Sequence, residues 1–283
     1  MIKVACARDE IKSLTSHQIK FLLDKDDKGE YLLLDVREPT EYQAGHIPGA
    51  LLVPLGELEA RQGELDRSKR IIAYCRSGNR SMAAATALCG LGFKSIYHLD
   101  GGILAWQYET IAGMPEAKPH FITEAADARD IFMLAMKLEK GSWNFYLRAR
   151  DKAQAKAVKE TFQTLADAED GHMTRLYREA VSLLGDQALM PLEKIKQELK
   201  VDYIEGGIEI SPALARIGEK FRDEMEALEI ALEKEYMAYD FYKRISVIVE
   251  KASAKFVLHE LVLEERKHAD ILLLRLQEIV GQQ

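Results

Sequence analysis

The chain of 283 residues has few cysteines, no long apolar run and no excess of positive charge. Its three cysteines, Cys6, Cys75 and Cys89, are too few for a disulfide framework and form no C-x-x-C pair, which favours a reducing compartment. No apolar run approaches the roughly 18 residues that span a bilayer, and charges interrupt the start too early for a signal peptide. The net charge of −7 argues against a nucleic-acid surface. These absences predict a cytoplasmic protein that binds neither membranes nor nucleic acid.

Residues 1–112 alternate between strand and helix signals. The runs 31–36 and 70–75 are short, apolar and bounded by polar residues, as in strands buried on both faces of a parallel sheet. A helical stretch at 81–91 follows the second run. The alternation predicts an α/β layered domain. Two prolines then discourage helix, so we expect residues 113–123 to form a linker.

Residues 124–283 show long amphipathic periods instead. Thr123 is the expected N-cap of the first helix. The connection between the second and third helices contains glycines and prolines and is too long for a hairpin turn. Four helices with one long crossover between the second and third are the ferritin-like arrangement, an all-α four-helix bundle. The expected helices are 124–150, 153–184, 213–249 and 252–280.

The strongest pattern in the second half is a repeat at an offset of 96 residues. A Glu-x-x-His motif occurs twice at this offset, and a glutamate lies 30 residues upstream of each copy. Glu and His three residues apart lie on one helix face, so both can bind one metal. One such pair arises freely by chance, but two pairs in register do not. The predicted metal ligands are Glu139, Glu169, His172, Glu235, Glu265 and His268.

Four carboxylates and two imidazoles from four helices are the ligand set of a di-iron carboxylate bundle. By symmetry, the glutamates of the two motifs are expected to bridge two metal ions, and the upstream glutamates to be terminal ligands. Iron suits these ligands, and manganese accepts them too. Tyr146 and Tyr242 also match across the repeat, two turns beyond the upstream glutamates. Either they donate hydrogen bonds to ligand carboxylates or they pack in the core.

These residues resemble the rubrerythrin branch of the ferritin-like superfamily, over about 124–283. The resemblance implies a non-haem di-iron site that reduces peroxide or dioxygen. The chain departs from the family in two ways. It has no paired C-x-x-C motifs for a rubredoxin iron site, so electrons must come from an external donor. It also has Ala238, with Ser142 as the repeat counterpart, where rubrerythrins carry an extra glutamate.

In the first half, a cysteine loop begins at Cys75, the last residue of the apolar run 70–75, and a helix opens after it. A thiolate there faces free backbone N–H groups and the positive end of the helix dipole. Arg76 and Arg80 add positive charge, which favours the thiolate. A thiolate in this setting suits nucleophilic sulfur transfer through a persulfide on Cys75. The alternative is a buried structural cysteine.

The stretches around this loop are similar to a single-domain rhodanese, a sulfurtransferase, over about 10–110. The resemblance implies that Cys75 carries the persulfide and that backbone amides of 76–80 cradle it. The six-residue loop is the length that the family uses for sulfur, while its phosphatase relatives have a longer one. Asp35, Arg37 and His46 are expected to be structural. The matching stretches are Leu34–Glu38, Gly45–Ala50, Leu99–Gly102 with Trp106, and the catalytic loop Cys75, Arg76, Ser77, Gly78, Asn79 and Arg80.

The two halves together predict a fusion of a sulfurtransferase and a di-iron bundle. Thiosulfate or small persulfides are the expected sulfur donors, and a homodimer is the expected assembly. Coupling is a sharper hypothesis, in which persulfide or thiol sulfur supplies electrons to the irons. The main alternative is a bundle that binds iron or senses peroxide without turnover. Cys89 is expected to be a buried, inert thiol, and Cys6 is a candidate to resolve Cys75.

Overall fold

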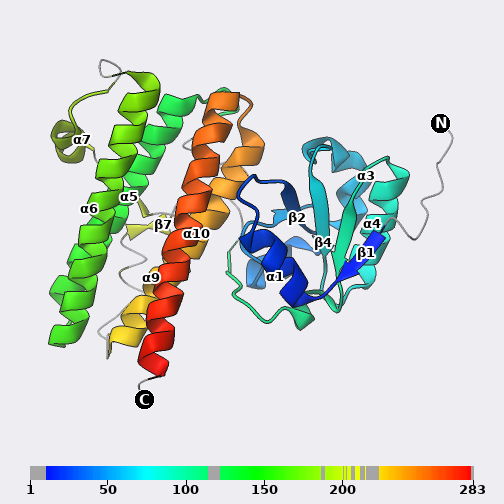
Figure 1. Ribbon diagram of the computed structural model, residues 1–283, viewed down its shortest axis with the longest axis horizontal. Coiled ribbons are helices and arrows are strands. Elements are labelled where there is room, and N and C mark those ends of the chain that lie inside the picture. Colours follow the sequence, from blue (N-terminus) through cyan, green and yellow to red (C-terminus); the bar gives the residue numbers. More distant parts are fainter. Residues whose placement is uncertain are drawn as a thin grey trace. The chain divides into compact units, whose positions relative to one another are not determined.

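The computed structural model divides into two compact units, Met1–Glu116 and Ala117–Gln283, which Figure 1 shows as ribbons. Most of the predicted linker 113–123, and the candidate resolving residue Cys6, lie outside the described residues. The residues described are 11–113, 122–185, 189–199, 201, 203–204, 208–210, 214 and 223–281.

The first unit is a five-stranded parallel sheet with strand order β1-β5-β4-β2-β3. The predicted strands 31–36 and 70–75 are β2 and β4, which pair along their whole length at the centre of the sheet. The predicted α/β fold is therefore confirmed for this half. The strands are β1 (Ile11–Leu14), β2 (Tyr31–Asp35), β3 (Leu51–Leu52), β4 (Arg70–Tyr74) and β5 (Ile96–Leu99); the helices are α1 (Ser16–Asp24), α2 (Pro39–Ala44), α3 (Leu58–Arg61) and α4 (Asn79–Gly90).

Helices cover both faces of this sheet, because successive strand residues point to opposite faces. Leu32 and Leu34 pack with α4 residues such as Leu88 in one core cluster. Leu33 packs with Ile19 of α1 in a second cluster. The central strands are thus buried on both faces, which explains why they appear in the sequence as continuous apolar runs.

The second unit is a bundle of four long helices, which confirms the predicted all-α fold. The first helix begins after Asp127, whose carboxylate accepts hydrogen bonds from Arg129 N and Asp130 N. Thr123 is therefore not the N-cap, contrary to the prediction. Asp223 caps the third helix, which begins at Glu224, eleven residues after the predicted start at 213. Most of the residues between these two positions lie outside the described part of the chain. The helices are α5 (Ala128–Lys152), α6 (Lys156–Leu184), α9 (Glu224–Ile248) and α10 (Ala252–Val280).

The crossover between α6 and α9 has structure that the sequence did not predict. It contains α7 (Leu192–Glu198) and an antiparallel pair, β6 (Tyr203–Ile204) and β7 (Ile208–Glu209). Lys140 of α5 donates hydrogen bonds to the carbonyls of Lys196 and Leu199. Lys196 in turn donates to Asp170 of α6. The crossover is therefore fastened to both helices next to two of the predicted ligands.

Gly141 allows the crossover to lie this close to α5. A Cβ at this position would lie 1.7 Å from the carbonyl oxygen of Tyr203, far inside van der Waals contact. Only glycine fits here.

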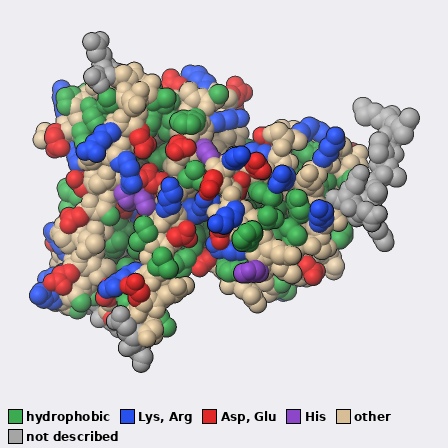
Figure 2. Space-filling view, viewed as in Figure 1, with side chains coloured by type: hydrophobic (Ala, Val, Ile, Leu, Met, Phe, Trp, Pro, Cys, Tyr) green, Lys and Arg blue, Asp and Glu red, His purple; other side chains and the backbone are tan. Residues whose placement is uncertain are grey.

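Charged side chains of both signs are interspersed on the visible face of each unit, as Figure 2 shows. Among the described residues, no helix combines the length and the apolar character needed to cross a bilayer.

Candidate functional site

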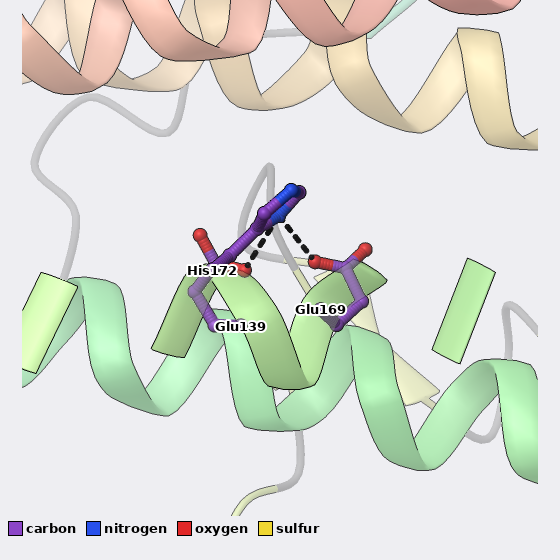
Figure 3. Close-up of side chains that lie close together, drawn as sticks. All are labelled: Glu139, Glu169 and His172. Carbon is purple, nitrogen blue, oxygen red and sulfur yellow. Dashed lines mark hydrogen bonds and ion pairs between the residues drawn. The ribbon is translucent and has the colours of Figure 1, made fainter. Parts of the chain in front are cut away.

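The bundle brings the six predicted metal ligands together in two triads. Within each triad, the ligand atoms lie within 4.8 Å of one another. Figure 3 shows the first triad, in which the imidazole of His172 points between the carboxylates of Glu139 and Glu169. All four glutamates are buried. One triad is Glu139 of α5 with Glu169 and His172 of α6; the other is Glu235 of α9 with Glu265 and His268 of α10.

The two triads have nearly the same geometry, as the sequence repeat requires. In the first, His172 Nδ1 lies 3.2 Å from Glu169 Oε2 and 3.5 Å from Glu139 Oε2. In the second, His268 Nδ1 lies 3.4 Å from Glu235 Oε2 and 3.6 Å from Glu265 Oε2. The two imidazole rings stack with centroids 3.9 Å apart. The triads therefore meet at one centre.

The donor atoms of this centre fit bound metal ions. Glu235 Oε2 and His268 Nδ1 are buried and lie 3.4 Å apart, but neither atom has a partner in hydrogen-bond geometry. A buried polar atom without a partner is costly, and buried carboxylates require a cation nearby. Carboxylate oxygen and imidazole nitrogen are ligands for iron, manganese and zinc. The residues present thus match a two-metal carboxylate site.

Lys234 is a residue of this centre that the sequence analysis missed. It is buried, and its ammonium lies 2.5 Å from Glu169 Oε1 and 3.3 Å from Glu235 Oε1. Burial raises the pKa of both carboxyls, but the lysine and the histidine of each triad outweigh it, so both pKa values are lowered. Comparing the two repeat halves could have pointed to Lys234, because the matching position 96 residues earlier holds Leu138.

Tyr146 and Tyr242 are both fully buried in the bundle. The ring of Tyr146 packs against Phe145 and Phe162, and its centroid lies 5.3 Å from Lys234 Nζ. Core packing is thus one role of Tyr146. The hydrogen bonds from these tyrosines to ligand carboxylates stay a prediction.

A cavity of about 560 Å³ reaches the metal centre from the side of the bundle. Leu165, Leu228 and Leu272 give it apolar walls, and an ion pair between Arg275 and Glu224 (3.1 Å) lies at its edge. Four of the predicted ligands also line it: Glu169, His172, Glu235 and His268. Small molecules can therefore approach the centre through this cavity.

In the first unit, Cys75 lies directly after β4 and is 1% exposed. The backbone N–H of Gly78 donates a hydrogen bond to its Sγ at 3.1 Å. Gly78 has φ +97°, a left-handed conformation that favours glycine, and α4 begins at the next residue. The thiol thus faces the N-terminus of a helix, as predicted.

The loop favours the thiolate form of Cys75. Burial raises the pKa of the thiol, but hydrogen bonds from Ser81 and from the backbone of Ser77 and Gly78 outweigh burial. The pKa is therefore lowered from the ordinary 9.0. Ser81 was absent from the predicted loop; its hydroxyl oxygen also lies 2.9 Å from the carbonyl oxygen of Gly78. A lowered pKa is typical of reactive cysteines.

The turn at Gly101 and Gly102 packs against the backbone of the cysteine loop. Ile103 N donates to the carbonyl of Cys75 at 2.8 Å, and Leu104 N to that of Arg76 at 3.1 Å. A Cβ on Gly102 would lie 2.4 Å from Cys75 O. These contacts hold the backbone of the loop in place, while the side chains of Arg76, Ser77 and Asn79 are exposed.

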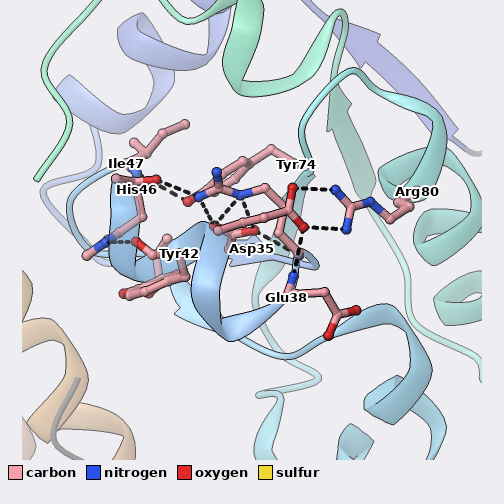
Figure 4. A network of polar contacts seen from close by, with 11 residues as sticks. Asp35, Glu38, Tyr42, His46, Ile47, Tyr74 and Arg80 are labelled. Atoms are coloured by element: carbon pink, nitrogen blue, oxygen red, sulfur yellow. Dashed lines mark hydrogen bonds and ion pairs between the residues drawn. The ribbon is translucent and has the colours of Figure 1, made fainter. Parts of the chain in front are cut away.

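Arg80 is fastened to Glu41 rather than free in the loop. Its two Nη atoms each donate to one carboxylate oxygen at 2.7 Å, as the dashed lines in Figure 4 show. The hydrogen bond from Arg80 lowers the pKa of Glu41 to about 2, against an opposing effect of burial. Arg80 still contributes positive charge near Cys75.

The polar residues expected to be structural are bonded within the fold. Arg37 Nη2 donates to Asp35 Oδ2 at 2.6 Å and to the carbonyl of Gly45 at 2.8 Å. His46 Nδ1 lies 3.0 Å from the carbonyl of Tyr42, also drawn in Figure 4. All three predicted residues are buried.

Cys89 does not match its prediction. It is buried in α4, but it is disulfide-bonded. The expectation of an inert thiol is therefore wrong, and Cys75 is the free cysteine of the described part. Disulfides are uncommon in reducing compartments, so this bond does not agree with a reducing setting.

Comparison with known families agrees with both sites. A rubrerythrin family model matches residues 130–274, just over half of the chain. The chain belongs to the rubrerythrin family. A model of the rhodanese-like domain matches residues 19–109, so this rubrerythrin-family protein also carries a rhodanese-like domain. Rubrerythrin membership implies a di-iron site, and the two triads are groups that could hold metal ions.

Relatives of this rubrerythrin-family chain include sulfurtransferases. The putative sulfurtransferase YtwF of Bacillus subtilis is 37% identical over 101 residues, 36% of this chain and 95% of YtwF. The HTH-type transcriptional regulator Rv0324 of Mycobacterium tuberculosis is 42% identical over 33% of this chain, and the putative sulfur carrier protein YrkF of B. subtilis is 37% identical over 36%. The matches cover 41% of Rv0324 and 56% of YrkF, about half the length of these relatives.

Among solved structures, a rhodanese-related protein from Thermoplasma volcanium is 32% identical, with a TM-score of 0.32. The match covers 35% of this chain and 97% of that one.

Proposed function

We propose that the protein is a bifunctional enzyme. Cys75 transfers sulfane sulfur, and the metal centre reduces peroxide or dioxygen. The free Cys75, held at the N-terminus of α4 by the Gly78 amide, supports the first activity. The two carboxylate–histidine triads support the second.

Sulfur transfer uses the thiolate of Cys75 as the nucleophile. The thiolate attacks the outer sulfur of thiosulfate, the S–S bond breaks, and sulfite leaves with the bonding electrons. The backbone amides of residues 76–80 cradle the persulfide on Cys75, with Arg76 and Arg80 beside it. A thiol acceptor, as its thiolate, then attacks the outer sulfur, and Cys75 leaves as thiolate. A small persulfide serves as donor in the same way.

At the metal centre, Glu169 and Glu265 would be shared between two ions, Glu139 and Glu235 would be terminal ligands, and His172 and His268 would each hold one ion. Iron bound there would supply electrons for the reduction of peroxide or dioxygen, and manganese would fit the same donors. The buried triads exclude bulk water, and the cavity along α6 and α10 admits the small substrate. Tyr146 and Tyr242 donate hydrogen bonds to ligand carboxylates.

The proposed partners follow from this chemistry. Thiosulfate or persulfides and peroxide or dioxygen are the substrates, and an external donor supplies electrons, because the chain has no C-x-x-C pair. Membranes and nucleic acid are not partners in this proposal. We propose a homodimer in the cytoplasm, where Cys75 stays reduced, although the Cys89 disulfide does not favour that location.

A second function has one observation in its favour. Ala238 lies fully buried where rubrerythrins carry an extra glutamate, so the peroxide-specialised ligand is missing. The bundle would then bind iron or sense peroxide beside the sulfurtransferase. Turnover separates the two: an enzyme consumes many equivalents of peroxide per chain, whereas a sensor reacts once.

The sulfur activity is tested with thiosulfate as donor and cyanide as acceptor. Cys75→Ser should abolish thiocyanate formation, while Cys89→Ser, which removes a cysteine already engaged in a disulfide, should retain it. Activity that survives in Cys75→Ser would overturn the assignment.

A further inference from the structure

Lys234 places a positive charge inside the predicted metal centre. It is 3% exposed and comes directly before the ligand Glu235 on α9. Its Nζ lies 2.5 Å from Glu169 of one triad and 3.3 Å from Glu235 of the other. The aromatic ring of Tyr146 lies 5.3 Å from the same nitrogen. The ammonium thus contacts carboxylates of both triads and has little access to water.

The sequence repeat shows that this charge is specific to one half. The position 96 residues earlier holds Leu138, also buried and directly before a ligand, Glu139. Leucine is part of the hydrophobic core there. The two triads therefore have the same candidate ligands, but the residue before the upstream glutamate is Leu138 in one and Lys234 in the other.

We propose that Lys234 is a built-in cation of the centre that holds Glu169 and Glu235 in place without metal and weakens binding of the second metal ion. The inference rests on the proposed two-metal centre and adds a property to it. Lys234 is a positioning residue, because it acts through the ligand carboxylates.

The charges of the centre give the physical reason. Four carboxylates carry −4, and Lys234 reduces this to −3 in the metal-free state. Two divalent ions bring the total to +1 with the lysine, and to zero without it. Like charges in a buried site repel strongly. The first ion can enter a centre that is still negative, whereas the second creates the excess positive charge.

The same charge stabilises the metal-free protein. Buried carboxylates without a cation are costly, and removing one partner of a buried ion pair is strongly destabilising. Lys234 contacts two of the four carboxylates, so the bundle can fold before metal arrives.

The test replaces Lys234 with the residue that the other half already uses, Lys234→Leu, with Lys234→Met as a second variant of similar length. Fe²⁺ binding to the full chain is measured without oxygen by equilibrium dialysis and elemental analysis, and thermal unfolding is followed with and without Fe²⁺. Lys267→Leu is the matched control, because Lys267 also comes directly before a predicted ligand, His268, but is exposed.

The proposal predicts that either variant binds the second Fe²⁺ at least tenfold more tightly than wild type. The Tm of the metal-free variant should fall by roughly 5 °C, while the rise in Tm on adding Fe²⁺ should be larger than in wild type. In Lys267→Leu, the second-ion affinity should equal that of wild type.

An unchanged or weaker second-ion affinity in both variants would overturn the role of Lys234 but leave the two-metal centre standing. If wild type and variants alike bind no Fe²⁺, the metal centre itself is wrong, and this inference fails with it. A lower Tm without any change in affinity would show a purely structural lysine and would also overturn the proposal.

Discussion

At the level of single residues, the reactivity of Cys75 depends on the hydrogen bonds around its sulfur. Because those from Ser81, Ser77 and Gly78 outweigh burial, its pKa is lowered from 9.0. We expect the rate of alkylation by iodoacetamide to reach half its maximum at a pH below 9. Ser81→Ala should move this midpoint upward. The same midpoint in folded and urea-unfolded protein would contradict the account.

Glu41 gives the cysteine-loop unit a specific acid sensitivity. Its pKa is about 2 in the folded protein against an ordinary 4.5, chiefly because Arg80 donates to it. A lowered folded pKa stabilises the fold fully above the ordinary value, and this contribution is lost as pH falls from about 4.5 towards 2. Thermal unfolding of Glu41→Gln between pH 2.5 and 6 should show a weaker loss of Tm with acid than wild type.

The control for this prediction is a substitution of Arg80, which forms the ion pair with Glu41. Arg80→Gln should weaken the same acid dependence, because the pKa of Glu41 then returns towards its ordinary value. Identical pH profiles for wild type and both variants would show that the pair contributes nothing.

Residue types at fixed spacing made the clustering of the six candidate ligands predictable, whereas the position of Lys234 was not predicted. A lysine on a charged helix is usually solvated, and the one sequence signal for its burial is the leucine at the matching repeat position, Leu138. The disulfide of Cys89 was also missed, because no local sequence pattern indicates it.

At the level of elements, the crossover is fixed to α5 by Gly141. We expect Gly141→Ala to destabilise the bundle by about 1–3 kcal/mol, because its Cβ would overlap the Tyr203 carbonyl and displace β6. Chemical unfolding measures the change in the free energy of unfolding.

Gly171 of α6 is the matched control for this substitution. It too is a helix-interior glycine, but a Cβ there meets nothing within 4 Å. Gly171→Ala should therefore stabilise by roughly 0.5–1 kcal/mol, through helix propensity alone. Equal effects of the two substitutions would contradict the proposed packing of the crossover.

The long elements were predictable, and the short ones were not. The long amphipathic helices have a period that spans many residues, and β2 and β4 are continuous apolar runs that mark buried strands. By contrast, α7, β6 and β7 are too short to show a period, and contacts with α5 and α6 stabilise them. Helix starts depend on one capping side chain, and Asp127, with its two hydrogen bonds, is the N-cap in place of Thr123.

At the level of the whole molecule, one chain joins a rhodanese-like domain to a rubrerythrin bundle. The fusion motivates the hypothesis that sulfur chemistry at Cys75 supplies electrons to the metal centre. Coupling predicts that Cys75→Ser slows persulfide-driven peroxide turnover by at least tenfold while leaving turnover with an artificial electron donor unchanged. Equal persulfide-driven rates in wild type and Cys75→Ser would show two independent sites.

The most direct test of the account is the metal content of the full chain, measured by elemental analysis of protein purified without oxygen. The account predicts about two iron ions per chain, from the two triads, and a loss of this iron when His172 and His268 are replaced by alanine. No stoichiometric transition metal, even after anaerobic loading with Fe²⁺, would contradict it and would leave a sulfurtransferase attached to a metal-free bundle.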